Sequence, residues 1–146
     1  MRFRKLESEK ELEAYRNAFL ASYEERAEAK GSELPLCYLQ SCKVVGVFNQ
    51  QDQMVAGYVL GTAEPLRLLS FVPESARKGL IVPFHCDWSD CCEVTCVWKL
   101  PEVSLIWMSA RFWPHTLIGV LASGKQILLG HNQSTRLDKF YTALWP

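Results

Sequence analysis

The sequence lacks any long hydrophobic run, and it lacks an excess of charge of either sign. Its 146 residues carry 16 basic and 16 acidic side chains, so the formal net charge is zero. A balanced charge gives no electrostatic reason to expect a nucleic acid or an anionic membrane as a partner. The apolar stretches are much shorter than the roughly 20 residues that cross a bilayer. We therefore expect no nucleic-acid partner and no membrane span.

The beginning of the chain lacks the apolar core of a secretory signal peptide, since MRFRKLESEKELEAY passes directly from basic residues into a charged segment. This absence favours a cytoplasmic protein, in which cysteines are more often reduced than paired in disulfides. The length and the 49% hydrophobic content are ordinary for a globular protein. We expect a single domain that spans residues 1–146.

A histidine and four cysteines lie close together in PFHCDWSDCCEVTCVWKLP, residues 83–101, but the C-x2-C pairs of zinc ribbons and fingers are missing. Cys91 and Cys92 are adjacent, so on a strand they would point to opposite faces. Asp90 and Glu93 would disfavour a reactive thiolate. We favour a strand whose buried cysteines act as small hydrophobic residues. A zinc site and a redox-active cysteine pair remain the alternatives.

Two patterns near the N-terminus predict a strand and then a helix. RFRKL predicts a short strand over residues 2–6. Apolar residues at three- and four-residue steps predict an amphipathic helix over residues 8–31. Ser8 and Glu11 have the spacing of a capping box at its start, and Gly31 has the position of a C-cap glycine.

The middle of the chain is typical of β-structure. Two β-branched runs around the polar turn NQQDQ predict a hairpin over residues 42–62. PLRLLSF, residues 65–71, continues the second of these strands or begins a third, and residues 72–83 form a loop or a short helix. The alternating segment 91–100 predicts a further strand. We expect the alternation to place these side chains on one face: Cys92, Val94, Cys96 and Trp98.

The last part of the chain predicts a helix, a strand and a second helix. SLIWMSARFWPHTLIGVLASG, residues 104–124, fits a buried helix that ends at Gly124 and is kinked or restarted at Pro114. Residues 125–132 predict a short strand, and residues 134–146 an amphipathic helix. The order β-α-β-β-β-α-β-α indicates an α+β fold, in which helices cover both faces of a mainly antiparallel sheet.

This order and two local motifs resemble the GNAT superfamily of acyl-CoA-dependent N-acyltransferases. VVGVFNQQDQMVAGYVLG is similar to the family's second and third strands, and QILLGHN followed by RLDKFYTALW is similar to its fifth strand and next helix. In the second motif, Asn132 and Tyr141 are the matching residue types. For an acyltransferase, the resemblance implies Glu93 as general base, Tyr141 as general acid and acetyl-CoA as the cofactor. The other interpretation of Glu93 is a solvated glutamate at a strand end.

The family's glycine-rich turn after the fourth strand is missing. That turn directs backbone N–H groups at the pyrophosphate of acyl-CoA, and a Cβ atom would block the approach. The equivalent segment here, KLPEVSLIWMSARFWPHT, contains no glycine. Glu102 would repel a phosphate, and Arg111 lies a helical turn or more too far along. We therefore expect no bound cofactor.

The family pattern continues with two more strands after its last helix, so the resemblance implies a C-terminally truncated sheet here. The strand around residues 127–129 would then be an uncovered edge, which invites pairing with another chain. We expect a homodimer or another protein partner. The candidate interface residues are large apolar side chains of the last part of the chain: Trp107, Trp113, Ile127, Leu129, Phe140 and Trp145.

Three functional hypotheses follow from these features. The first is a protein of GNAT-like fold that lacks acetyl-CoA-dependent catalysis and acts as a protein-binding or regulatory module. The second is a divergent N-acetyltransferase that transfers an acyl group from acyl-CoA to an amine. The third is a cysteine-based metal or redox module, which the spacing favours least.

Overall fold

A five-stranded sheet organises the molecule, which the computed structural model describes for residues 1–24, 34–64, 66–81 and 86–130. The strands lie in the order of the sequence: β1 (Arg2–Leu6), β2 (Lys43–Phe48), β3 (Met54–Gly61), β4 (Cys91–Lys99) and β5 (Ile127–Leu129). Neighbouring strands from β1 to β4 are antiparallel, and β5 runs parallel to β4. The predicted α+β fold with a mainly antiparallel sheet is confirmed.

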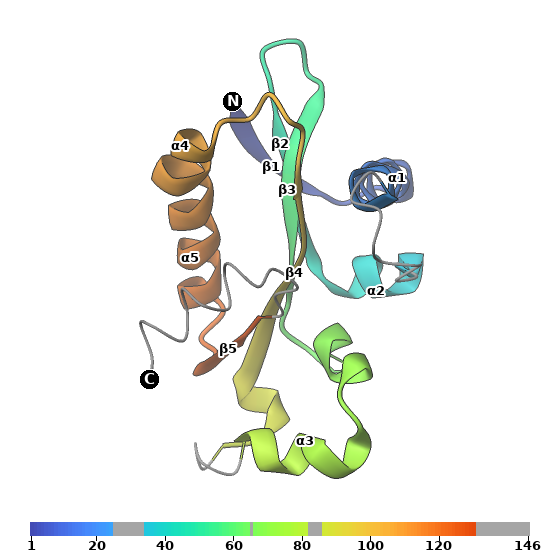
Figure 1. Ribbon diagram of the computed structural model, residues 1–146, viewed down its shortest axis with the longest axis vertical. Helices are drawn as coiled ribbons and strands as arrows, with labels where there is room; N and C mark the ends of the chain where they lie inside the picture. Colours follow the sequence, from blue (N-terminus) through green and yellow to red (C-terminus); the bar gives the residue numbers. More distant parts are fainter. Residues whose placement is uncertain (25–33, 65, 82–85, 131–146) are drawn as a thin grey trace.

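Helices cover both faces of this sheet, as predicted (Figure 1). One face is covered by α1 (Glu9–Glu24) and α2 (Leu36–Ser41), and the other by a continuous helical segment. That segment consists of α4 (Leu105–Trp107), the π-helical turn η4 (Met108–Phe112) and α5 (Trp113–Ala122). The connection between β3 and β4 contains η1 (Arg67–Phe71), α3 (Glu74–Ile81) and η3 (Trp88–Asp90).

The two hydrophobic clusters of the core lie on opposite faces of the sheet. Successive residues of a strand point to opposite faces. In β2, Val44 therefore packs in the cluster under α1 and α2, whereas Val45 packs in the cluster under α5. In β3, Val59 and Tyr58 divide in the same way. Burial on both faces explains why these strands are almost continuously apolar.

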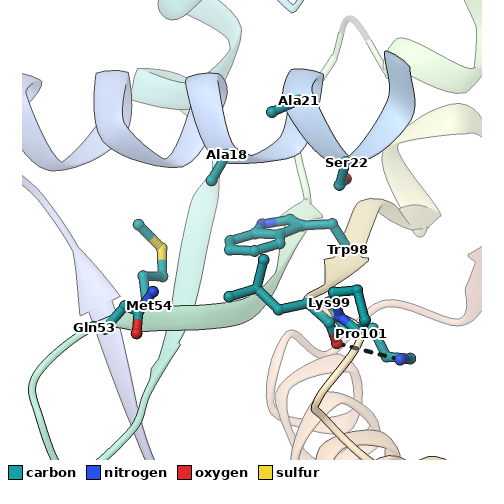
Figure 2. Close-up of a pocket in the computed structure, with 9 residues that line it drawn as sticks. Ala18, Ala21, Ser22, Gln53, Met54, Trp98, Lys99 and Pro101 are labelled. Atoms are coloured by element: carbon teal, nitrogen blue, oxygen red, sulfur yellow. Dashed lines mark hydrogen bonds between the residues drawn. The ribbon is translucent and has the colours of Figure 1, made fainter. Parts of the chain in front are cut away.

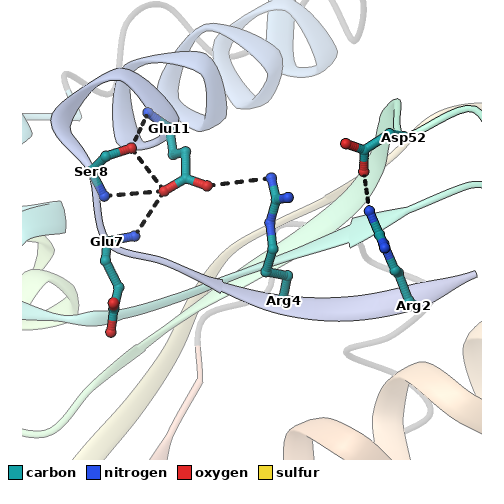
Figure 3. Close-up of polar contacts among 6 residues, drawn as sticks. All are labelled: Arg2, Arg4, Glu7, Ser8, Glu11 and Asp52. Atoms are coloured by element: carbon teal, nitrogen blue, oxygen red, sulfur yellow. Dashed lines mark hydrogen bonds and ion pairs between the residues drawn. The ribbon is translucent and has the colours of Figure 1, made fainter.

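The start of α1 has the predicted capping box (Figure 3). Ser8 Oγ accepts a hydrogen bond from the Glu11 amide at 3.3 Å, and the Glu11 carboxylate accepts one from the Ser8 amide at 3.1 Å. These bonds from Ser8 lower the pKa of Glu11. The carboxylate also pairs with Arg4 at 3.3 Å, which joins the helix to β1. The exposed pair of Arg2 and Asp52 contributes little by comparison.

Three features of the fold differ from the sequence-based expectations. Residues 65–71 were expected to be strand, but η1 is a 3-10 helix, and α2 was not expected at all. The segment from α4 to α5 is helical, and Pro114 stands at the start of α5. This segment is not a buried helix, however, because Ile106 is 82% and Leu121 79% exposed. Gly31 lies outside the described residues.

A close helix–strand contact at Gly57 fixes the position of α1. Gly57 of β3 pairs with Trp98 of β4, and the ring of Tyr15 on α1 lies directly above it. A Cβ atom at Gly57 would lie 2.5 Å from Tyr15 Cε2 and 2.7 Å from the Val45 carbonyl oxygen. Only glycine leaves room for this approach, so the contact depends on a missing side chain.

We predict that Gly57→Ala lowers the free energy of unfolding by about 1–3 kcal/mol, because the added methyl group overpacks the core against backbone. The matched control is Gly79→Ala in α3, where the new Cβ atom would meet nothing within 4 Å. That change should stabilise by about 0.5–1 kcal/mol, as alanine is the better helix former. Urea unfolding of both variants measures the difference, and equal effects would contradict the described contact.

Candidate functional site

Glu93 in β4 is completely buried, with 0% of its surface exposed. Its Oε1 accepts hydrogen bonds from Tyr38 Oη at 2.5 Å and from the Arg67 amide at 2.7 Å. Its Oε2 accepts one from the Leu68 amide at 2.8 Å. The interpretation of Glu93 as a solvated glutamate was wrong, because the pattern of β4 does not show the donors that η1 and α2 bring to it. A role as general base would require one of these bonds to be released.

Three other segments of the chain meet this carboxylate of β4. α2 contributes Tyr38, η1 contributes two backbone amides, and β3 ends beside it at Gly61. A Cβ atom on Gly61 would lie 2.9 Å from Glu93 Oε1, so glycine is needed for this approach. Burial, followed by the hydrogen bond to Glu93, raises the pKa of Tyr38. The phenol therefore stays protonated and serves as a donor.

A β-bulge interrupts β4 three residues after Glu93. Thr95 pairs with Val59 and Trp98 with Gly57, so β4 has one more residue than β3 across this interval. Cys96, within the bulge, has a φ of 51°, which is left-handed backbone and unusual for a residue other than glycine. Its carbonyl oxygen accepts a hydrogen bond from Tyr15 Oη at 2.7 Å, which holds the bulge against α1.

The bulge also changes which side chains share a face. Cys92 and Val94 pack in the cluster under α5, but Cys96 and Trp98 pack in the cluster under α1 and α2. Thr95 Oγ1 lies 3.7 Å from Cys96 Sγ, so these neighbours lie side by side. The expected common face of Cys92, Val94, Cys96 and Trp98 was therefore wrong, because the extra residue shifts the alternation by one position.

The bulge lies where β5 no longer pairs with β4. The described register joins β4 to β5 over three residue pairs, from Cys91 with Ile127 to Glu93 with Leu129. Beyond Glu93, no described strand pairs with this side of β4. The bulged part of β4 is thus bordered by β3 on one side and by no described strand on the other.

A pocket of about 300 Å³ lies at the end of β4, between this strand and α1. Figure 2 shows the indole ring of Trp98 beneath Ala18, with Met54 beside it. The small side chains of α1 leave this space open, and Lys99 and Gln53 supply polar groups to the lining. The volume is near the lower end of the range for small-molecule sites.

The candidate interface residues have varied surroundings. Trp107 is half-buried, with its ring stacked on Phe3 at a centroid distance of 5.8 Å, whereas Trp113 is 43% exposed. Ile127 and Leu129 are half-buried and pack against the small cluster around Cys91. Four residues singled out in the sequence lie outside the described residues: Asn132, Phe140, Tyr141 and Trp145.

The cysteines of the described residues are all free thiols, and three of them in β4 are buried: Cys91, Cys92 and Cys96. Burial raises the pKa of all three thiols. Within the described ranges, no three histidine, cysteine or acidic side chains are grouped so that they could hold a metal ion. His85 lies outside these ranges.

Sequence reasoning missed three residues of this site: Tyr38, Arg67 and Thr95. Arg67 Nη1 lies 3.4 Å from Thr95 Oγ1, next to the bulge. No local pattern could have indicated these contacts, since they join residues 26 to 55 positions apart in the chain. Gly61, the last residue of β3, was the one available signal in the sequence, because a glycine in a strand often marks a place where another group comes close to the backbone.

We predict that Glu93→Gln lowers the free energy of unfolding by about 1–3 kcal/mol, because its amide NH₂ group would face a buried donor. Tyr38→Phe should cost about 1 kcal/mol through one lost hydrogen bond. Glu74→Gln, at an exposed position on α3, is the control and should change little. Denaturant unfolding gives all three values. A Glu93→Gln protein of full stability would contradict the anchoring role.

We predict slow modification of Cys92 and Cys96 by a thiol reagent at about pH 8, because burial and a raised pKa both reduce the reactive thiolate. Cys37 is exposed and should react first. The slow rates should rise with pH, since a raised thiol pKa moves ionisation to higher pH. Mass spectrometry of timed samples, with an unfolded sample as control, identifies the modified positions; equal rates in the folded protein would refute the prediction.

Comparison with known proteins finds likeness at the level of structure. No protein-family model matches the sequence, and no curated protein matches it. None of the described helices has the length and apolar character required to cross a bilayer.

Three solved structures are similar to this fold. FeeM, an N-acyl amino acid synthase from uncultured soil microbes, superposes with a TM-score of 0.73 and 16% identity, over 96% of this chain and 75% of FeeM. An integron cassette protein from the mobile metagenome of V. cholerae gives a TM-score of 0.56 and 12% identity, over 99% and 84%. A mutant of a Bacillus halodurans protein gives 0.56 and 14%, over 99% and 91%. The chain therefore has a GNAT-like α+β fold.

Proposed function

We propose that the protein is an N-acyltransferase, which moves an acyl group from a thioester to an amine. The observation that carries this proposal is the bulge at Cys96, in the part of β4 that no described strand pairs on its β5 side. A bulge takes backbone N–H groups out of the ladder. Such groups can donate hydrogen bonds to a carbonyl oxygen and stabilise the negative charge that develops on it during acyl transfer.

The chemistry needs few protein groups. The amine nitrogen attacks the thioester carbonyl carbon, the C–N bond forms, the C–S bond breaks, and the leaving thiolate takes the proton that the amine loses. The protein supplies orientation and the stabilisation of the carbonyl oxygen. Glu93 as general base and Tyr141 as general acid remain proposals, since the former is held by three donors and the latter is not described.

The surroundings of the bulge support the same function. The pocket lined by Trp98, Met54 and Ala18 offers an apolar space on the α1 side, suited to the hydrocarbon part of a substrate. FeeM, whose fold covers 96% of this chain, is an N-acyl amino acid synthase. Amide formation at this position of the fold is thus the activity that agrees with both observations.

We propose that the acyl donor is not held through the pyrophosphate of CoA. The first helical turn after β4 presents Leu105, 73% exposed, and Ile106, 82% exposed, which cannot bind phosphate. The Trp107 amide already donates a hydrogen bond to Ser104 Oγ at 3.1 Å, so this N–H group is not free for a phosphate. Glycine, which lets a phosphate reach backbone N–H groups, does not occur in this segment.

A protein-binding module is the second candidate function. The outer surface of α5 is apolar and exposed, with Leu117 at 52%, Ile118 at 67% and Leu121 at 79%. Exposed apolar surface of this kind commonly marks a contact with another protein. A homodimer or another protein partner would cover it, with the candidate interface residues Trp107, Trp113, Ile127, Leu129, Phe140 and Trp145 as expected contributors.

We predict acyl transfer from a carrier-free thioester, such as an acyl N-acetylcysteamine, to an amine acceptor. Replacing N-acetylcysteamine by CoA should not improve the apparent affinity by more than a few-fold, because no glycine turn is present to bind the pyrophosphate. Titration calorimetry should give a dissociation constant for acetyl-CoA no tighter than about 1 mM. Mass spectrometry of the amide product measures the transfer.

Two controls separate the candidate functions. Enzyme unfolded by heat gives the rate of uncatalysed aminolysis, which thioesters undergo slowly. Sedimentation equilibrium at micromolar concentration reports self-association independently of any activity. Micromolar binding of acetyl-CoA would refute the donor proposal, and no transfer above the uncatalysed rate, together with a stable dimer, would favour the binding module.

A further inference from the structure

The guanidinium group of Arg67 has hydrogen-bonding capacity that the described structure does not use. Its Nη1 lies 3.4 Å from Thr95 Oγ1, a long and therefore weak hydrogen bond. Its Nη2 is buried and has no hydrogen-bond partner. The ring of Phe71 contacts the group at 5.2 Å and supplies no acceptor oxygen. A buried charged donor without an acceptor is costly, so its presence requires an explanation.

The neighbouring carboxylate does not supply the missing partner. Both oxygens of Glu93 accept hydrogen bonds from Tyr38 and from the amides of Arg67 and Leu68. Among the residues that the structure describes, no carboxylate lies within ion-pair distance of the Arg67 guanidinium. The side chain as a whole is half-buried, but Nη2 itself is not exposed, so a solute can reach Nη2 only if the neighbouring side chains move aside.

The backbone of Arg67 fixes where the guanidinium lies. Its amide is bound to Glu93, and its carbonyl oxygen accepts a hydrogen bond from Ser70 Oγ at 2.7 Å. The guanidinium consequently reaches Thr95, whose Oγ1 lies 3.7 Å from Cys96 Sγ in the bulge. Its positive charge partly offsets the burial that raises the pKa of the Cys96 thiol. An anion bound to Nη2 would therefore lie beside the bulge.

We propose that Arg67 binds the carboxylate of an α-amino acid, and that the amino group of this ligand is the acyl acceptor. The planar fork of arginine matches a carboxylate, and its free Nη2 donor gives one oxygen a partner. Amine and carboxylate are attached to the same carbon in an α-amino acid. A carboxylate on Arg67 thus brings the amine to the Thr95–Cys96 segment, where the thioester carbonyl is proposed to bind. This inference rests on the proposed N-acyltransferase function and names its acceptor class.

The test compares each amino acid with its carboxamide, which has the same side chain and amino group but no carboxylate. The common L-amino acids and their carboxamides, for example L-leucine and L-leucinamide, are titrated into the full chain and assayed with the N-acetylcysteamine thioester. A charge-assisted hydrogen bond to a carboxylate predicts that at least one acid binds roughly 10–100-fold more tightly than its amide. This comparison needs no variant, so a folding defect cannot obscure it.

Variants then assign the discrimination to one side chain. Arg67→Met should remove the preference for the acid over the amide, and Arg67→Lys should keep part of it, since the charge remains but the fork is lost. Arg77→Met is the matched control: Arg77 is a half-buried arginine on α3 whose Nε donates to the Val72 carbonyl oxygen at 3.0 Å. It should retain the full preference, and thermal unfolding checks that each variant is folded.

The failures of the inference and of the proposed function are distinguishable. Transfer to amides and acids at equal rates, or an acid preference that survives in Arg67→Met, overturns the role of Arg67 while acyl transfer stands. Arg67-dependent binding of an acid without any transfer overturns the N-acyltransferase and leaves the carboxylate site in place. If no acid of the panel binds or reacts, the carboxylate site is refuted.

Discussion

The carboxylate of Glu93 is the group on which the geometry of the site depends. A carboxyl group with no contact to water is tolerated only when its oxygens are supplied with hydrogen-bond partners. Here α2 provides the Tyr38 hydroxyl and η1 provides two backbone amides. The same three bonds hold both connecting elements against β4. The position of Arg67, and hence of its guanidinium beside Thr95, follows from the bond between its own amide and Glu93.

The bulge at Cys96 is held from the opposite direction by α1. Tyr15 donates to the Cys96 carbonyl oxygen, and its ring lies over Gly57, the β3 residue that pairs with Trp98. The unusual φ of Cys96 persists because these contacts leave the backbone little alternative. β4 is thus anchored at Glu93 by α2 and η1 and at Cys96 by α1. Such double support is what a site requires if backbone N–H groups are to keep a fixed direction.

Features that depend on neighbours in the sequence could be predicted, and features that depend on distant contacts could not. The capping box of Ser8 and Glu11 and the hairpin of β2 and β3 follow from local spacing, and both were predicted correctly. The burial of Glu93 depends on donors more than 24 positions away, so its pattern was equally consistent with a solvated glutamate. The bulge could not be predicted for a similar reason. The apolar and polar residues of β4 alternate as in a regular strand, and the extra residue becomes visible only in the pairing of β4 with β3.

In the helical segment of residues 104–124, a local sequence pattern led to a wrong prediction of burial. SLIWMSARFWPHTLIGVLASG is apolar on almost every side, which predicts burial when the segment is considered alone. The sheet can cover one side of a helix, and here Met108 and Phe112 face it while Leu121 and Ile106 face outward. The composition of a helix shows how much apolar surface it could bury. It does not show whether the segment that buries this surface belongs to the same chain.

The two faces of the sheet consequently differ in what they offer a ligand. The face under α1 and α2 contains the polar groups: the anchored carboxylate, the Arg67 guanidinium and the Thr95 hydroxyl. The helix on the other face offers apolar surface directed outward, beginning at the first turn after β4. A thioester whose carbonyl lies at the bulge would have its amine acceptor on the polar side. Its carrier would extend along the end of β4 toward Leu105 and Ile106, where the surface suits an apolar or protein-borne carrier better than the phosphates of CoA. The proposed acyl transfer and the proposed protein contact would then use opposite faces of the sheet, and the missing glycine turn would restrict the kind of donor without excluding the reaction.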